Sequence, residues 1–119
     1  MPFVDTSKLR VIERLPGWHG RYFRSPSMTF AHYDFVRGSS IHEHFHPQEE
    51  VYEVVEGELE ITIDGVTEVA RPGMVAIVPS DAPHSVKART GFDLGSERKT
   101  DQISAVAACA GILRASDSL

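Results

Sequence analysis

The middle of the chain is a series of short apolar segments, separated by turn residues about six to ten positions apart. In residues 59–63 apolar and polar residues alternate, which is typical of a strand with one buried face. Residues 74–78 form an uninterrupted apolar run, which we interpret as a strand buried on both faces. The pattern predicts strands over residues 28–36, 41–46, 50–55, 59–63, 66–70, 74–78 and 84–88.

Turn residues mark where these strands end. Asp64-Gly65 lies between two alternating segments and is a strong signal for a two-residue hairpin. The segment Pro79-Ser-Asp-Ala-Pro83 predicts a sharp turn before the strand at residues 84–88. Many short strands with regular turns, and no helical period among them, predict an all-β fold, a barrel or a sandwich.

The N-terminal part is interrupted by prolines and glycines. Residues 9–15 fit a short strand or one helical turn, and a loop carrying Trp18 and His19 is expected after them. We expect residues 1–27 to form an arm that packs on the barrel or on a partner subunit.

The C-terminal part is ambiguous. Residues 90–101 are polar, and the apolar residues from 103 to 113 fit a helical period. Closing a small barrel requires a strand in this region, so a strand over residues 103–108 is favoured. The barrel is then expected to span residues 28–113, with a tail over residues 114–119.

Composition narrows the function classes. A chain of 119 residues is the size of one domain. No apolar run approaches the ~20 residues of a membrane span, and the N-terminus lacks the pattern of a secretory signal, so a cytoplasmic protein is expected. The net charge of −5, without a basic block, argues against nucleic acid and anionic membranes as partners. Cys109 is the only cysteine and is interpreted as a buried, inert thiol.

Metal-binding residue types are concentrated in one segment. His42, His44 and His46 are three of the six histidines, and Glu50 follows closely. His44, His46 and Glu50 share one parity, so their side chains would face the same side of an extended chain. His84 follows the predicted turn, and antiparallel neighbours can bring it back to this segment. Imidazole and carboxylate groups together suit iron, manganese, nickel, copper or zinc.

Other assignments remain open. His42 has the same parity as His44 and His46, so it could replace His44 as a ligand if the strand register is shifted. Glu49 could replace the neighbouring glutamate if the bend at the proline breaks the alternation. His19 and His32 are interpreted as surface or supporting residues, and Tyr52 either fills the core or directs its hydroxyl to a substrate.

The segment resembles the first motif of the cupin superfamily, which reads Gly, five residues, His-x-His, three or four residues, Glu, six residues, Gly. The chain meets it at Gly38, His44, His46, Glu50 and Gly57.

The second motif of that superfamily reads Gly, five residues, Pro-x-Gly, two residues, His, three residues, Asn. The chain meets it at Gly73, Pro79 and His84. Asp81 replaces a glycine and tolerates the same left-handed turn geometry. Ala88 replaces the asparagine, which is not a metal ligand in the superfamily.

The resemblance implies a cupin β-barrel, or double-stranded β-helix, with one divalent transition metal (Fe, Mn, Ni, Cu or Zn) in its mouth. Carried over position by position, the metal ligands are His44, His46, Glu50 and His84. The resemblance also implies a homodimer that pairs through strand edges and N-terminal arms.

Two function classes follow. One is a metalloenzyme that acts on a small oxygen-rich molecule as a dioxygenase or a lyase/isomerase. The other is a non-catalytic module that binds or senses a sugar or metabolite. A third reading has the histidines acting as acid–base residues without metal. No catalytic residue apart from the expected ligands is identified.

Overall fold

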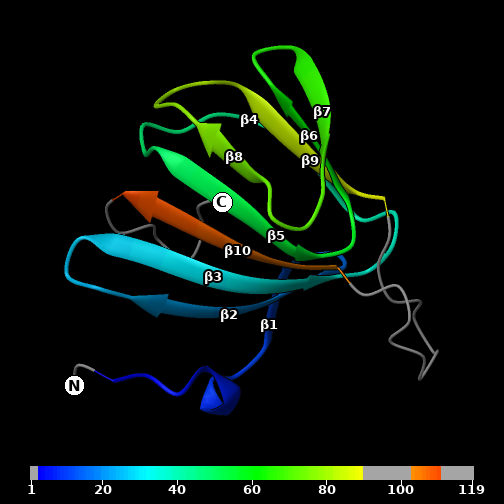
Figure 1. Cartoon of the computed structure of the whole chain (residues 1–119). Coiled ribbons are helices and arrows are strands. Elements are labelled where there is room, and N and C mark those ends of the chain that lie inside the picture. Colours follow the sequence, from blue (N-terminus) through cyan, green and yellow to red (C-terminus); the bar gives the residue numbers. More distant parts are fainter. Residues whose placement is uncertain (1–2, 90–102, 111–119) are drawn as a thin grey trace.

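The structure, a computed structural model, describes residues 3–89 in full and residues 103–110 by their backbone. Two antiparallel sheets face each other across a common core (Figure 1). In spatial order, the six-stranded sheet consists of β1 (Ile12–Leu15), β2 (Trp18–Arg24), β3 (Met28–Phe35), β10 (Ile103–Ala110), β5 (Glu50–Glu56) and β8 (Val75–Val78). The four-stranded sheet consists of β4 (Ser40–His44), β9 (His84–Ala88), β6 (Leu59–Ile63) and β7 (Val66–Ala70). A 3₁₀ turn, Thr6–Lys8, precedes β1.

The all-β prediction is confirmed. Every predicted central strand is present, and β6, β7 and β9 have the predicted bounds. The favoured strand near the C-terminus is β10, which lies between β3 and β5 and joins the two halves of the six-stranded sheet. No helix within residues 3–89 or 103–110 is long and apolar enough to cross a membrane.

Two predicted turns rely on positive backbone angles. Asp64 and Gly65 have φ values of 49° and 79°, as a two-residue hairpin between β6 and β7 requires. Asp81 has a φ of 61°, so this aspartate adopts the left-handed conformation expected of it. The second turn directs the chain into β9.

The loop expected around Trp18 is wrong, because Trp18 begins strand β2. Its side chain is only 1% exposed and lies edge-on against Tyr33 and Phe35, at centroid distances of 5.3 and 4.7 Å. Gly20 does not break this strand, because Tyr22 covers it. A Cβ at position 20 would lie 2.8 Å from atoms of that ring. The glycine therefore serves close packing, not a turn.

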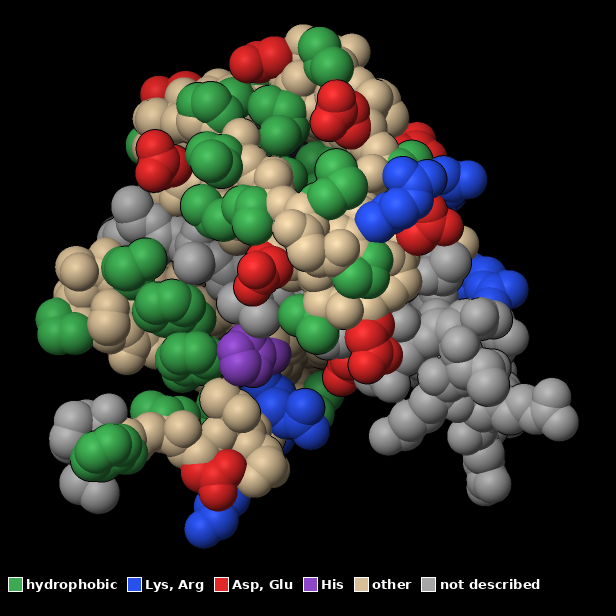
Figure 2. Space-filling model, viewed as in Figure 1, with side chains coloured by type: hydrophobic (Ala, Val, Ile, Leu, Met, Phe, Trp, Pro, Cys, Tyr) green, Lys and Arg blue, Asp and Glu red, His purple; other side chains and the backbone are tan. Residues whose placement is uncertain are grey.

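The expectation that residues 74–78 are buried on both faces is also wrong. The strand begins at Val75, and Val75 and Ile77 are 51% and 61% exposed. They alternate with Ala76 and Val78, so only Ala76 and Val78 face the core. Val75 and Ile77 line a hollow of about 230 Å³ between β8 and the β6–β7 hairpin, where Figure 2 shows hydrophobic side chains at the surface.

The burial of Trp18 gives a direct test of the N-terminal strands. Trp18→Ala is expected to lower the free energy of unfolding by about 3–5 kcal/mol, because it removes a large side chain from the core. Phe3→Ala is the matched control, since Phe3 is 87% exposed, and should change stability by less than about 0.5 kcal/mol. Urea unfolding followed by circular dichroism measures both. Similar values for the two variants would contradict the core position of Trp18.

Candidate metal centre

The segment that carries His44 and His46 crosses from one sheet to the other. β4 ends at His44 in the four-stranded sheet, and the chain passes His46 and Pro47 before β5 begins with Glu50 in the six-stranded sheet (Figure 1). The predicted strand therefore ends two residues early. Shared parity on one extended strand is not what brings these side chains together.

A bulge in β4 turns His44 towards the interior. Ile41 pairs with Val86, but His44 pairs with His84, so β4 contains one more residue than β9 between these pairs. The extra residue shifts the alternation. The side chains of Ile41 and His44 thus both point to the inner face of the sheet, whereas His42 is exposed. This bulge decides against His42 as a member of the cluster.

The turn before β9 is tied to the segment around His46. The backbone N–H of Asp81 donates a hydrogen bond to the His46 carbonyl at 2.9 Å. The Ser80 hydroxyl donates one to the Pro47 carbonyl at 2.6 Å. These bonds fix the start of β9, so that His84 lies opposite His44.

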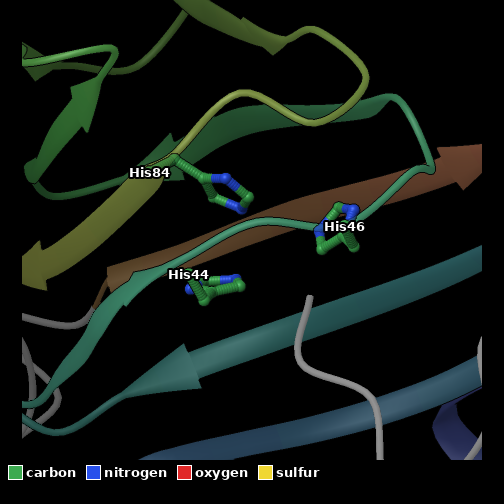
Figure 3. Close-up of side chains that lie close together, drawn as sticks. All are labelled: His44, His46 and His84. Atoms are coloured by element: carbon green, nitrogen blue, oxygen red, sulfur yellow. The ribbon is translucent and has the colours of Figure 1, made fainter.

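Three imidazoles meet as a result (Figure 3). One ring nitrogen from each of His44, His46 and His84 lies within 4.8 Å of the others. The ring of His84 is 4.1 Å from that of His44 and 5.0 Å from that of His46, between centroids. The structure thus brings together three of the four residues expected to bind metal.

Backbone carbonyls fix the orientation of each ring. The Nδ1 atoms of His44, His46 and His84 lie 2.8–2.9 Å from the carbonyl oxygens of His42, Gln48 and Ala82, respectively. A carbonyl only accepts, so Nδ1 carries the proton and Nε2 of the neutral ring offers its lone pair. The Nε2 atoms of His44 and His46 are buried and have no hydrogen-bond partner among the described residues. Converging imidazole lone pairs are the arrangement that a divalent metal ion requires.

Glu50, the fourth expected residue, lies beside the cluster and is fully buried. Its carboxylate oxygens are 3.5 Å from His84 Nε2 and 3.9 Å from His46 Nε2. A buried carboxylate needs a positive partner, because desolvation of its charge is costly. A protonated imidazole or a metal ion meets that need here.

The histidines differ in their affinity for protons. Burial lowers the pKa of His44 below its usual value of 6.5. Burial acts in the same direction on His84, but hydrogen bonding and the charge of Glu50 outweigh it and raise the pKa of His84. In the metal-free protein, His84 is therefore the first of the two to take up a proton as the pH falls.

None of the remaining candidates belongs to the cluster found among the described residues. Glu49 is exposed, and His19 pairs with Glu13 on the surface at 3.1 Å. His32 packs edge-on against Phe23. Tyr52 is fully buried in the core, on the same face of β5 as Glu50.

Interior residues of the first three strands were not identified from the sequence. Arg14, Tyr22 and Tyr33 come from β1, β2 and β3. Arg14 lies over the Tyr22 ring, and Tyr22 meets Tyr33 edge-on; Tyr33 is buried, whereas Arg14 and Tyr22 are partly buried. The signal that could have found them is the alternation of Trp18, Gly20 and Tyr22. The surrounding glycines and prolines concealed it.

A family model described as "Cupin domain" matches residues 31–94. No curated protein matches the chain. Among solved structures, an RmlC-like cupin from Shewanella frigidimarina superposes with a TM-score of 0.79 at 18% identity, over 94% of this chain and 92% of its own.

Two further solved structures align with this chain over almost the full length of both proteins. KdgF from Halomonas sp. has a TM-score of 0.74 at 18% identity, over 92% of this chain and 94% of its own. A predicted oxalate decarboxylase from Thermotoga maritima has a TM-score of 0.72 at 20% identity, over 92% and 99%. The family model covers more than half of the chain, and its range contains the whole histidine cluster. The chain belongs to the cupin family.

Proposed function

We propose that the protein binds one divalent transition metal (Fe, Mn, Ni, Cu or Zn) through His44, His46, His84 and Glu50. The observation that carries this proposal is the convergence of three imidazoles, each with its Nδ1 held by a backbone carbonyl, beside a buried carboxylate. These donors suit borderline metals, and four protein ligands leave positions open in an octahedral shell.

We further propose that the site acts on a small oxygen-rich metabolite, as a dioxygenase or as a lyase/isomerase. When bound, a metal of this kind supplies Lewis acidity or redox chemistry to a chelating substrate. The protein positions the metal ligands and leaves one side of the site accessible to the substrate. Glu50 and His84 are buried at the inner side of the site, whereas His44 and His46 are partly exposed and mark the side open to a substrate.

A structural neighbour described as a predicted oxalate decarboxylase favours this substrate class. At 20% identity the likeness concerns the fold, so the substrate class is proposed here by analogy and oxalate itself is not. The alternative is a binding or sensing cupin that holds such a metabolite without converting it.

Metal content tests the ligand set. Protein purified without chelators should contain about one transition metal per chain by elemental mass spectrometry. His44→Ala and His84→Ala should each weaken metal affinity by more than about tenfold, since loss of even an outer partner of a ligand costs about 10–100-fold. His42→Ala is the matched control, because His42 is exposed and adjacent in sequence. Equal loss in all three variants, or wild-type protein without metal, would contradict the proposal.

Turnover separates the enzyme from the binding module. Protein reconstituted anaerobically with Fe(II) is mixed with oxygen and a panel of hydroxy acids, oxo acids and diketones. Oxygen uptake with product formation is the result expected of a dioxygenase. Product without oxygen uptake identifies a lyase or isomerase. Binding of a panel member without any product would overturn the enzymatic function and leave the binding module.

The homodimer expected from the family resemblance stays a prediction. Exposed apolar side chains at and just before the edge strand β1, Ile12 and Val11, are of the kind that pairing would bury. Light scattering at micromolar concentration should give twice the chain mass. The mass of a single chain would contradict this expectation.

A further inference from the structure

The outer face of the six-stranded sheet, which is turned away from the core, carries a row of apolar residues across its strands. Phe23 of β2 pairs with Phe30 of β3, and Val51 of β5 pairs with Ile77 of β8. Ala108 of β10 connects these two pairs in register. Ladder partners share one face of a sheet. The rings of Phe23 and Phe30 are stacked, with centroids 5.0 Å apart, and Ile77 is 61% exposed.

A second row on the same face has opposite charges near its two ends. Arg21 of β2 pairs with His32 of β3, and β10 connects His32 in register to Glu53 of β5. Three strand spacings of about 4.8 Å keep Arg21 and Glu53 roughly 14 Å apart within one chain. Arg21 Nε is buried without a hydrogen-bond partner among the described residues, whereas Glu53 is exposed. One chain thus offers a cation and an anion that it does not pair with each other.

A second copy of the chain satisfies both rows at once. A two-fold axis that runs along the strands, between β3 and β10, passes through the middle of the six-stranded sheet. Two outer faces packed across this axis place β2 opposite β5 of the partner subunit, and β1 opposite its β8. Arg21 then faces Glu53 of the partner subunit, and Phe23 faces Val51 of the partner subunit. The symmetry makes each contact twice.

The size of the face fits a stable dimer. Six strands of about six residues, at ~3.3 Å per residue and ~4.8 Å between strands, project an area on the order of 600 Å². Side chains add relief to this area, so the surface approaches the about 800 Å² that each partner buries in a specific interface. Figure 2 views this face and shows hydrophobic side chains over β2, β3, β5 and β8, with charged side chains between them.

We propose that the protein forms a homodimer through the outer faces of its six-stranded sheets, with Arg21 of each subunit paired to Glu53 of the partner subunit. The apolar row forms the centre of the interface. This inference goes beyond the proposed metal function and gives the expected homodimer a defined interface. Glu50 lies on the opposite, inner face of β5, so the interface contains no expected metal ligand from that strand.

Charge reversal tests the pairing, with the dimer dissociation constant measured by sedimentation equilibrium. The wild type should be mostly dimeric at micromolar concentration. Arg21→Glu and Glu53→Arg should each raise the dissociation constant about tenfold or more, because each brings like charges together at two symmetric contacts. The variant that combines both changes should return to within about threefold of the wild type. The gap of roughly 14 Å within one chain means that only a contact between chains explains such a recovery.

Two further variants test the apolar row and the specificity of the effect. Ile77→Ser should raise the dissociation constant about threefold to tenfold, because it removes apolar surface from the interface. Lys87→Glu is the matched control for charge, since Lys87 is exposed on β9 in the other sheet, and it should leave the constant unchanged. Circular dichroism should show the same fold in all variants, because surface substitutions rarely disturb it.

Three results would overturn the inference. One is the mass of a single chain for the wild type at micromolar concentration. Another is a dimer that the Arg21, Glu53 and Ile77 variants all leave unchanged, which would place the contact elsewhere, such as at the edge of β1. The third is a combined charge reversal that does not recover. Metal content, measured on the same samples, tests the proposed metal function separately from the interface.

Discussion

Three imidazoles with lone pairs aimed at one point repel each other unless a cation lies between them, and this constraint shapes the rest of the structure. Each ring is fixed through its Nδ1 by a backbone carbonyl only two residues away. The backbone thereby sets both tautomer and direction before any ligand arrives. The buried Glu50 adds a negative charge, and a positive charge at the same point would also offset the cost of desolvating this carboxylate.

Edge strands place the chemistry on both sheets. β4 and β1 are each the outer strand of a sheet, and each contains one extra residue relative to its partner. In β4 the bulge turns His44 inward, and in β1 it brings Arg14 over Tyr22. A central strand is held by ladders on two sides, so such a local shift in alternation costs less at an edge.

Turn chemistry and strand pattern were enough to predict most of the fold. Asp64-Gly65 and Asp81 adopt the positive angles that their residue types favour, and β6, β7 and β9 have the expected bounds. The errors have a common cause. The apolar run at β8 does not reveal that Val75 and Ile77 face away from the core, and the glycines around Trp18 resemble a loop until Tyr22 is seen packed over Gly20. Both depend on neighbours that are distant in sequence.

By itself, the sequence determined which residue types were available and at what spacing. Two motifs named His44, His46, Glu50 and His84, since side-chain chemistry and turn preferences are local properties. The tertiary structure decided how these residues meet. Three histidines converge because β4 bulges, because the Pro79–Pro83 turn is bonded to the His46 segment, and because the chain crosses between sheets before Glu50. Register and sheet position are set by pairing between distant segments. For that reason, only the folded chain shows His42 exposed beside an inward His44 and brings Arg14 over the Tyr22 ring.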